Sequence, residues 1–304
     1  MFFYFQHSVW FIASLTFATA LLWSSAYTLA PIILLIVSFY KFGKWSRKKL
    51  SKDDILLISI FILYALGMFF FVYLDGWLLR ELDKPSRFLL AIPVLLLLMN
   101  MQGKKELLFY GVIFGAFGSF CVGFYEVYYL NFGRAQGETH PIMFGNTALM
   151  LGLMSFVSAM WFKHKKRNAL LILALIAGGL GVGASILSAS RGGWIGLPFI
   201  IIFLVWQSKD LIGFKKSFLI SIFAVISLSI IVLVPQTGVQ DRFSQAYDDV
   251  NRFKHGDLVE NSVGQRFEMW KGAWFLFSDS PFFGVGKYKA IEVKEELMKQ
   301  GKLN

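Results

Sequence analysis

The sequence predicts an all-α polytopic membrane protein with about nine transmembrane helices and a helical segment on the periplasmic side. Composition is the first observation behind this fold class: of 304 residues, 56% are hydrophobic and 17% aromatic, and only 16% are charged. This apolar share exceeds that of a typical soluble domain. The second is that long apolar stretches recur along the chain, and the third is that basic residues gather in every second loop between them.

Nine apolar stretches are predicted to be spans, because the hydrocarbon core of a bilayer requires about 20 apolar residues per helix. They cover approximately residues 9–22, 30–42, 55–74, 88–101, 107–130, 141–162, 169–187, 194–206 and 218–234. Several are shorter than a full span, so tilted or half-length helices are expected.

The loop charges predict the orientation of these spans. One set of alternate loops, at residues 41–52, 104–105, 163–167 and 209–216, contains 15 of the 30 Lys and Arg residues. The other set contains five: Arg80, Lys84, Arg87, Arg134 and Arg191. Since cytoplasmic loops carry the excess of basic residues, we expect a bacterial inner-membrane protein with a cytoplasmic N-terminus. Residues 1–234 then form the transmembrane domain, and residues 235–304 a periplasmic loop domain of amphipathic helices.

Charge and cysteine content exclude several classes of function. The net charge of +11 is accounted for by residues that orient spans, so nucleic acid is not an expected partner. The single cysteine, Cys121, leaves no disulfide framework and no thiolate metal site. No two histidines have the spacing of metal ligands, so we expect neither a metal nor another cofactor.

The segment from Ser188 to Trp194 is the first candidate site, on the periplasmic side between two spans. Ser188 or Ser190 can cap the helix that begins near Gly192, which would place Arg191 beside free backbone N–H groups where an anion is favoured. Gly192 and Gly193 let a ligand approach the backbone closely. The alternative is that Arg191 is an interfacial residue beside a tight turn.

A second arginine begins an amphipathic helix in the periplasmic segment. The spacing of Ser262 and Gln265 is typical of a capping box, and Phe267, Trp270 and further aromatic residues follow on one face. This pattern places Arg266 in the first turn. Two arginines at helix starts on the same side of the membrane could bind a diphosphate through bidentate, charge-assisted hydrogen bonds.

Other polar residues on the periplasmic side allow two interpretations each. His140, at the entrance of a span, is either a general base or a capping and orienting residue. Glu126, near the outer end of a span, either pairs with a neighbouring arginine, which we expect, or takes part in catalysis. Asp83 and Arg87 either bind sugars of the substrate or pair with each other across a turn.

Three segments carry a family resemblance: Ser188–Gly196, Gly264–Trp274 and Asp279–Gly286. Together they resemble the core of the O-antigen ligase and polymerase superfamily. Two further segments, Arg80–Arg87 and His140–Asn146, are similar in placement to weaker family features. The resemblance extends from about Arg80 to Gly286.

The resemblance implies a GT-C-like, metal-independent, inverting glycosyltransferase. Such an enzyme lies among membrane lipids and moves a glycan from undecaprenyl diphosphate to lipid A-core. Arg191 and Arg266 correspond to the arginines that bind the donor diphosphate in this family. With His140 they are the candidate catalytic residues. The candidate substrate-binding residues are Arg80, Asp83, Arg87, Ser190, Gly192, Gly193, Gln265 and Trp270.

Ligases of this family also carry a histidine later in the large periplasmic loop, followed by further spans. No position of this sequence corresponds to that histidine, so we expect the general base and the last spans to lie beyond Asn304. The alternatives within the superfamily are an O-antigen polymerase and a protein O-oligosaccharyltransferase. A polysaccharide or lipid transporter is a non-enzymatic alternative, against which the sequence offers few charges within spans and no internal repeat.

Overall fold

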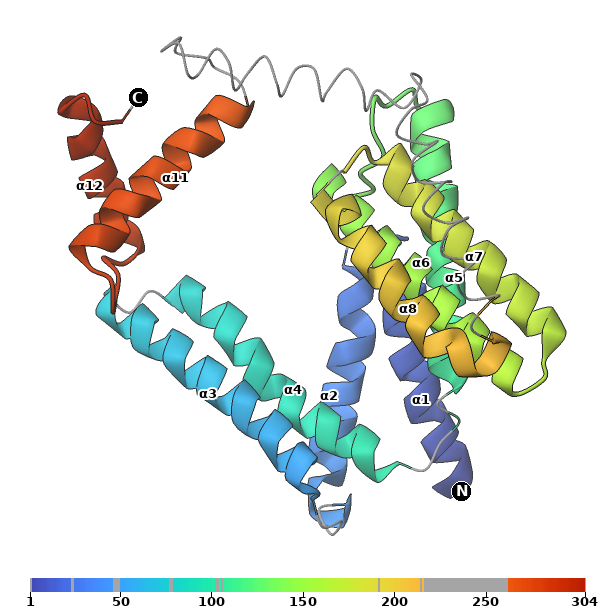
Figure 1. Ribbon diagram of the computed structural model, residues 1–304. Coiled ribbons are helices and arrows are strands. Elements are labelled where there is room, and N and C mark those ends of the chain that lie inside the picture. The colour runs from blue at the N-terminus through green and yellow to red at the C-terminus, as the bar shows by residue number, and fades with distance from the viewer. Residues whose placement is uncertain are drawn as a thin grey trace. The chain divides into compact units, whose positions relative to one another are not determined.

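The computed structural model describes residues 2–22, 25–45, 50–76, 79–101, 104, 106–190, 192–213, 215 and 262–303. Every regular element within these ranges is a helix (Figure 1), which confirms the predicted all-α class. The chain divides into two compact units that alternate along the sequence. Unit 1 comprises Met1–Lys49 and Leu90–Leu228, and unit 2 comprises Leu50–Leu89 and Ser229–Asn304.

Unit 1 is a bundle of packed helices. Its elements are α1 (Phe2–Ala18), α2 (Ala26–Trp45), the second part of α4 (Asp83–Asn100), α5 (Glu106–Tyr128), α6 (Pro141–His164), α7 (Asn168–Leu187), the short 3₁₀ helix η2 (Gly192–Gly196) and α8 (Leu197–Ile212). Helices α5, α6 and α7 lie side by side and all pack against one another, and α1 packs on α5 (Figure 1). The core between them contains the fully buried rings of Phe144 and Phe162.

Small residues allow these helices to approach closely. A Cβ atom at Gly181 of α7 would lie 2.6 Å from the Cα atom of Gly152 on α6. A Cβ atom at Gly111 of α5 would overlap the backbone carbonyl of Ser14 on α1. Helices in lipid associate through close packing of this kind. Lipid tails are as apolar as a leucine side chain, so moving a leucine from lipid into a helix interface gives no hydrophobic stabilisation.

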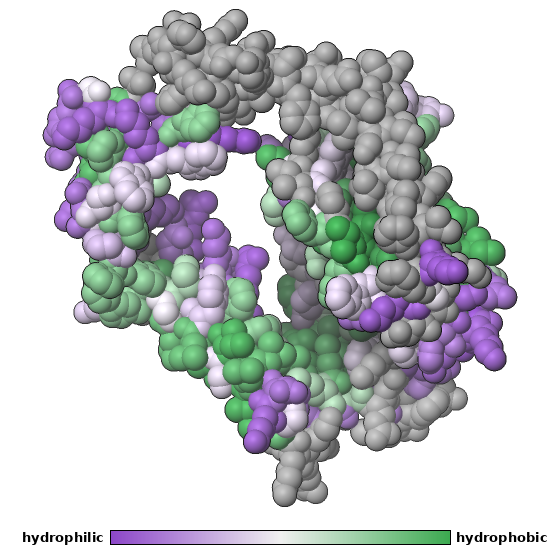
Figure 2. Space-filling model, viewed as in Figure 1, coloured by the Kyte–Doolittle hydropathy of each residue, from purple (hydrophilic) through white to green (hydrophobic). Residues whose placement is uncertain are grey.

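Unit 2 combines one long apolar helix with two more polar ones. It contains α3 (Lys52–Leu74), the 3₁₀ helix η1 (Leu79–Leu82), the first turns of α4, α11 (Ser262–Asp279) and α12 (Lys287–Lys299). Helix α3 begins with a capping box formed by Ser51 and Asp54. Its surface is hydrophobic over much of its length (Figure 2), and large side chains such as Leu63 are mostly exposed. An apolar helix with so little buried surface is suited to contact with lipid.

The helices agree with the predicted spans in place, but the count of nine is not confirmed. Eight of the nine stretches coincide with α1 to α8, and the ninth, at residues 218–234, lies outside the described residues. Among the described residues, four helices are long and apolar enough to cross a membrane: α3, α5, α6 and α7. The protein is therefore a multi-pass membrane protein. The predicted domain boundary after residue 234 also lies outside the described residues and stays a prediction.

Candidate functional site

Charged residues from two distant parts of the sequence meet in unit 2. An open cavity of about 720 Å³ is lined by Arg80, Glu81, Asp83, Lys84, Lys287 and Tyr288. The first four belong to η1 and the start of α4, and the last two begin α12. Two predicted substrate-binding residues, Arg80 and Asp83, therefore share one cavity. Lys287 was not among the predicted site residues, although it directly follows the Asp279–Gly286 segment.

The start of α12 is fixed on the end of α3. The backbone N–H of Lys287 donates to Oδ2 of Asp75, the C-cap residue of α3, at 3.1 Å. Gly286 precedes it with a φ of 77°, a conformation that favours glycine. A Cβ atom at Gly286 would also overlap the Asp75 carboxylate. Glycine at this position therefore permits the contact that carries Lys287 to the cavity.

An ion pair joins the two sides of the cavity. Nζ of Lys287 donates to Oε1 of Glu81 at 2.5 Å. This hydrogen bond, together with the charge of Lys287, lowers the pKa of Glu81 below its ordinary value. The same hydrogen bond and the charge of Glu81 raise the pKa of Lys287. Both groups are therefore charged at neutral pH.

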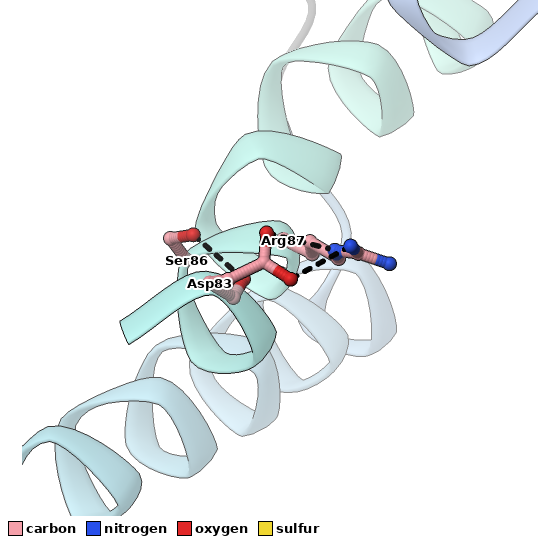
Figure 3. Close-up of polar contacts among 3 residues, drawn as sticks. All are labelled: Asp83, Ser86 and Arg87. Carbon is pink, nitrogen blue, oxygen red and sulfur yellow. Dashed lines mark hydrogen bonds and ion pairs between the residues drawn. The ribbon is translucent and has the colours of Figure 1, made fainter. Parts of the chain in front are cut away.

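Of the other charged residues of the cavity, Asp83 is paired with a described residue, whereas Arg80 and Lys84 are not. Arg87 binds Asp83 through two hydrogen bonds, Nη2 to Oδ2 at 2.7 Å and Nε to Oδ1 at 3.2 Å (Figure 3). The predicted pairing of these two residues across one helical turn is thus observed. Within the described ranges, Arg80 and Lys84 have no carboxylate within ion-pair distance. Two cations are left to attract an anionic group.

Helix α11 carries the second predicted arginine, also in unit 2. The helix begins at Ser262 and contains Gln265 and Arg266 near its start, both exposed. Trp270 is 65% exposed, and its ring meets that of Phe267 edge to face. A helix is thus observed where one was predicted, whereas its amphipathic character stays a prediction. The described residues include no carboxylate within ion-pair distance of Arg266.

The first arginine motif lies at the turn between α7 and η2 in unit 1. A helix does begin at Gly192, as predicted. The prediction that a serine caps it was wrong: the Ser188 hydroxyl donates to the carbonyl of Ser185 and accepts from the N–H of Ser190. The Ser190 hydroxyl is buried, and the described residues offer it no partner. Arg191 itself lies outside the described residues.

This turn packs tightly against α6. A Cβ atom at Gly145 would overlap the Ser188 hydroxyl, and one at Gly193 would lie 2.7 Å from Oδ1 of Asn146. Both α6 residues belong to the His140–Asn146 segment. The structure therefore brings that segment and the Ser188–Gly193 segment together, which explains why small residues are needed on both sides of the contact.

His140 occupies the N-cap position of α6. Its Nδ1 accepts a hydrogen bond from the N–H of Ile142 at 3.3 Å, and Pro141 follows as the first helical residue. Capping, one of the two predicted roles, is thus observed. Because Nδ1 is the acceptor here, a neutral ring carries its hydrogen on Nε2, so the imidazole can accept a substrate proton only at Nδ1 and only when the capping bond to Ile142 is broken.

Glu126 and Arg134 make polar contacts that were not predicted from the sequence. The Glu126 carboxylate was expected to pair with an arginine, but it accepts hydrogen bonds from the N–H groups of Gln136 and Gly137 instead. Arg134 donates to the backbone of Ser188. Arg134 is one of only five basic residues in the second set of loops, and this was a sequence signal for a structural or functional role.

The two arginine motifs belong to different units, so the predicted diphosphate clamp of Arg191 and Arg266 stays a prediction. Within the described ranges, no three His, Cys, Asp or Glu side chains are grouped as metal ligands would be. What the described geometry does offer is a cavity with two unpaired cations and an exposed arginine on α11.

Comparison with known proteins shows which family has these motifs. The sequence profile described as O-antigen ligase matches residues 176–303, which include both arginine motifs and the start of α12. An uncharacterized protein of Haemophilus influenzae is 31% identical over 301 residues, covering 96% of this chain and 75% of the relative.

Proposed function

Since this chain belongs to the O-antigen ligase family, we propose that it is an O-antigen ligase that transfers a glycan from undecaprenyl diphosphate to lipid A-core. The observation that carries the proposal is the family match over residues 176–303, because it includes both Arg191 and Arg266. The membrane-spanning helices are consistent with this proposal, because the lipid part of such a donor lies in the bilayer.

The proposed reaction is a single inverting displacement. An acceptor hydroxyl oxygen attacks the anomeric carbon of the donor glycan, and the bond from that carbon to the diphosphate oxygen breaks. The electron pair leaves with the diphosphate, and the hydroxyl proton passes to a base. Arg191 and Arg266 stabilise the negative charge that builds on the departing diphosphate. His140 is the candidate base among the described residues, and its Nδ1 can take the proton once the capping hydrogen bond from Ile142 is released.

The unit 2 cavity supports a role in substrate binding. Arg80 and Lys84 offer charge without a carboxylate partner among the described residues, and Tyr288, 46% exposed, offers a ring face. Cations attract phosphate or carboxylate groups, and aromatic rings pack against the apolar faces of sugars. We assign this cavity, with Asp83 in its lining and Arg87 bound to Asp83, to the glycan or diphosphate part of a substrate.

Arginine substitutions test the proposed roles directly. Arg191→Ala and Arg266→Ala should each lower the transfer rate by about a hundredfold or more, the typical loss when one group that stabilises developing charge is removed. Arg167→Ala is the matched control, because Arg167 pairs with Glu106 at 2.9 Å in a basic-rich loop. Transfer at the wild-type rate in Arg191→Ala would refute the assignment.

The products of a deletion strain distinguish ligase from the related activities. A ligase deletion leaves free lipid A-core and accumulates undecaprenyl-linked polymer. A single repeat unit on the core indicates a polymerase, and unchanged lipopolysaccharide with an unglycosylated protein indicates a protein O-oligosaccharyltransferase.

The orientation is proposed from the loop charges. Inner-membrane insertion with a cytoplasmic N-terminus would put the α7–η2 turn and α11 on the periplasmic side. Alkaline phosphatase fused after Gly133 should be active, since the enzyme folds only in an oxidising compartment, whereas fusion after Lys166 should be inactive. The opposite pattern would reverse the orientation.

A further inference from the structure

The turn between α7 and η2 leaves three consecutive carbonyl groups at the end of a helix, and all three are bound by one neighbouring segment. The carbonyl of Leu187 accepts from the N–H of Ala135 at 3.0 Å. The carbonyls of Ser188 and Ala189 accept from Nε and Nη2 of Arg134 at 2.9 and 3.4 Å. Carbonyls at the end of a helix have no partner within the helix. Arg134 and its neighbour therefore supply the missing donors.

The segment that holds the turn is itself held by a buried carboxylate. Oε2 of Glu126 accepts hydrogen bonds from the N–H of Gln136 at 2.8 Å and from that of Gly137 at 2.9 Å. Glu126 is only 7% exposed. Two neighbouring N–H groups converge on one carboxylate oxygen, which fixes the backbone of residues 136 and 137. The contacts thus form a continuous chain from Glu126 on α5, through residues 134–137, to the turn.

The turn requires such support because its backbone is in an unfavourable conformation. Ala189 has a φ of 50°, in the left-handed region that residues other than glycine avoid. Ser188 and Ser190 on either side are buried, with 0% and 2% of their surface exposed. A conformation of this kind persists only where surrounding contacts enforce it, and such conformations cluster at functional sites.

We propose that Arg134 is a positioning residue for this turn, supported by Glu126, and that through the turn it orients the diphosphate contact proposed for the adjoining Arg191. The proposal rests on the proposed function for its second step. The guanidinium group is suited to the first step because its planar fork reaches two carbonyls at once, which an ammonium group does not. Arg134→Lys should therefore only partly replace it.

A thiol reporter measures the first step without any transfer assay. In a Cys121→Ser background, which removes the single native cysteine, Ser190→Cys places a thiol at a site that is 2% exposed. Its alkylation by N-ethylmaleimide in membranes should be slow. Arg134→Ala should speed alkylation by about tenfold or more, because each hydrogen bond from a charged donor contributes about that factor to an equilibrium. Arg134→Lys should give an intermediate rate.

Arg167→Ala is the control, since it also removes an arginine of unit 1 but breaks only the exposed pair with Glu106. If the Ser190→Cys protein does not fold, tryptic cleavage after Arg191 in the otherwise native protein serves as the readout. It should be faster in Arg134→Ala than in Arg167→Ala. Equal rates for the two variants, by whichever readout is used, would overturn the proposal.

Transfer kinetics test the second step. Arg134→Ala should lower kcat for glycan transfer, with a smaller effect on the KM of the donor, and Arg134→Lys should restore part of kcat. If Arg191→Ala abolishes transfer but Arg134→Ala leaves kcat unchanged, the positioning role of Arg134 is overturned. If Arg191→Ala itself transfers normally, the proposed function fails, and the alkylation result still decides whether Arg134 holds the turn.

Discussion

The contact between Gly145 and the α7–η2 turn yields a prediction whose size follows from the structure. In Gly145→Ala, the new methyl group would overlap the Ser188 hydroxyl and lie 2.7 Å from Cβ of Ser190. Ordinary contact begins at 3.4 Å, so the turn must retreat by about 0.7 Å, the difference between the two distances. Both serines are buried and their Cβ atoms move only with the backbone. Overpacking of this kind costs about 1–3 kcal/mol.

The assay is thermal unfolding of the purified protein in detergent. A loss of about 1–3 kcal/mol corresponds to a fall in Tm of roughly 2–12 °C for a unit of this size. Gly179→Ala is the matched control, because a Cβ atom at Gly179, on an exposed face of α7, has nothing within 4 Å. That substitution should leave Tm unchanged or raise it, since alanine favours helix. Unfolding of Gly145→Ala at or above the Tm of Gly179→Ala would show that the predicted overlap with the turn does not occur.

The remaining predictions concern helix packing, pH and substrate binding. Gly152→Val should separate α6 from α7 at Gly181 and lower Tm by more than Gly179→Val does; equal losses would contradict the close approach. The Glu81–Lys287 contact should be lost as pH falls through the lowered pKa of Glu81, or rises through the raised pKa of Lys287, and persist between them. Hydrogen exchange at the Lys287 amide, bound to α3, measures this, and protection that does not vary with pH would count against it. Arg80→Ala should raise the KM of one substrate by about tenfold with kcat nearly unchanged, whereas an unchanged KM would remove the cavity from the substrate site.

Local sequence patterns predicted the helices well and their terminal contacts poorly. The stretches at residues 55–74, 141–162 and 169–187 match α3, α6 and α7 closely, because an apolar run of span length admits few other structures in lipid. The prediction that a serine caps η2 was wrong because the Ser188 side chain belongs to the end of the preceding helix. Ser188 is the C-cap of α7, and its hydroxyl is engaged there by Ser185 and Ser190.

The partner of Glu126 shows a similar limit. A buried carboxylate requires donors, and the sequence suggested an arginine because arginines lie in the same set of loops. Two backbone N–H groups ten and eleven residues away fill that role instead. Any residue can supply a backbone donor, so no side-chain pattern marks it in advance.

The sequence by itself determined that this protein is a helical membrane protein, and it supplied the two arginine motifs of its family. Span length, hydropathy and loop charge are properties of contiguous residues, so they can be read without a fold. Only the tertiary structure decided that Arg134 holds a turn 54 residues away and that Lys287 meets Glu81 across 206 residues. These contacts depend on how closely helices pack and where loops return, which small residues such as Gly145 and Gly286 permit but do not specify.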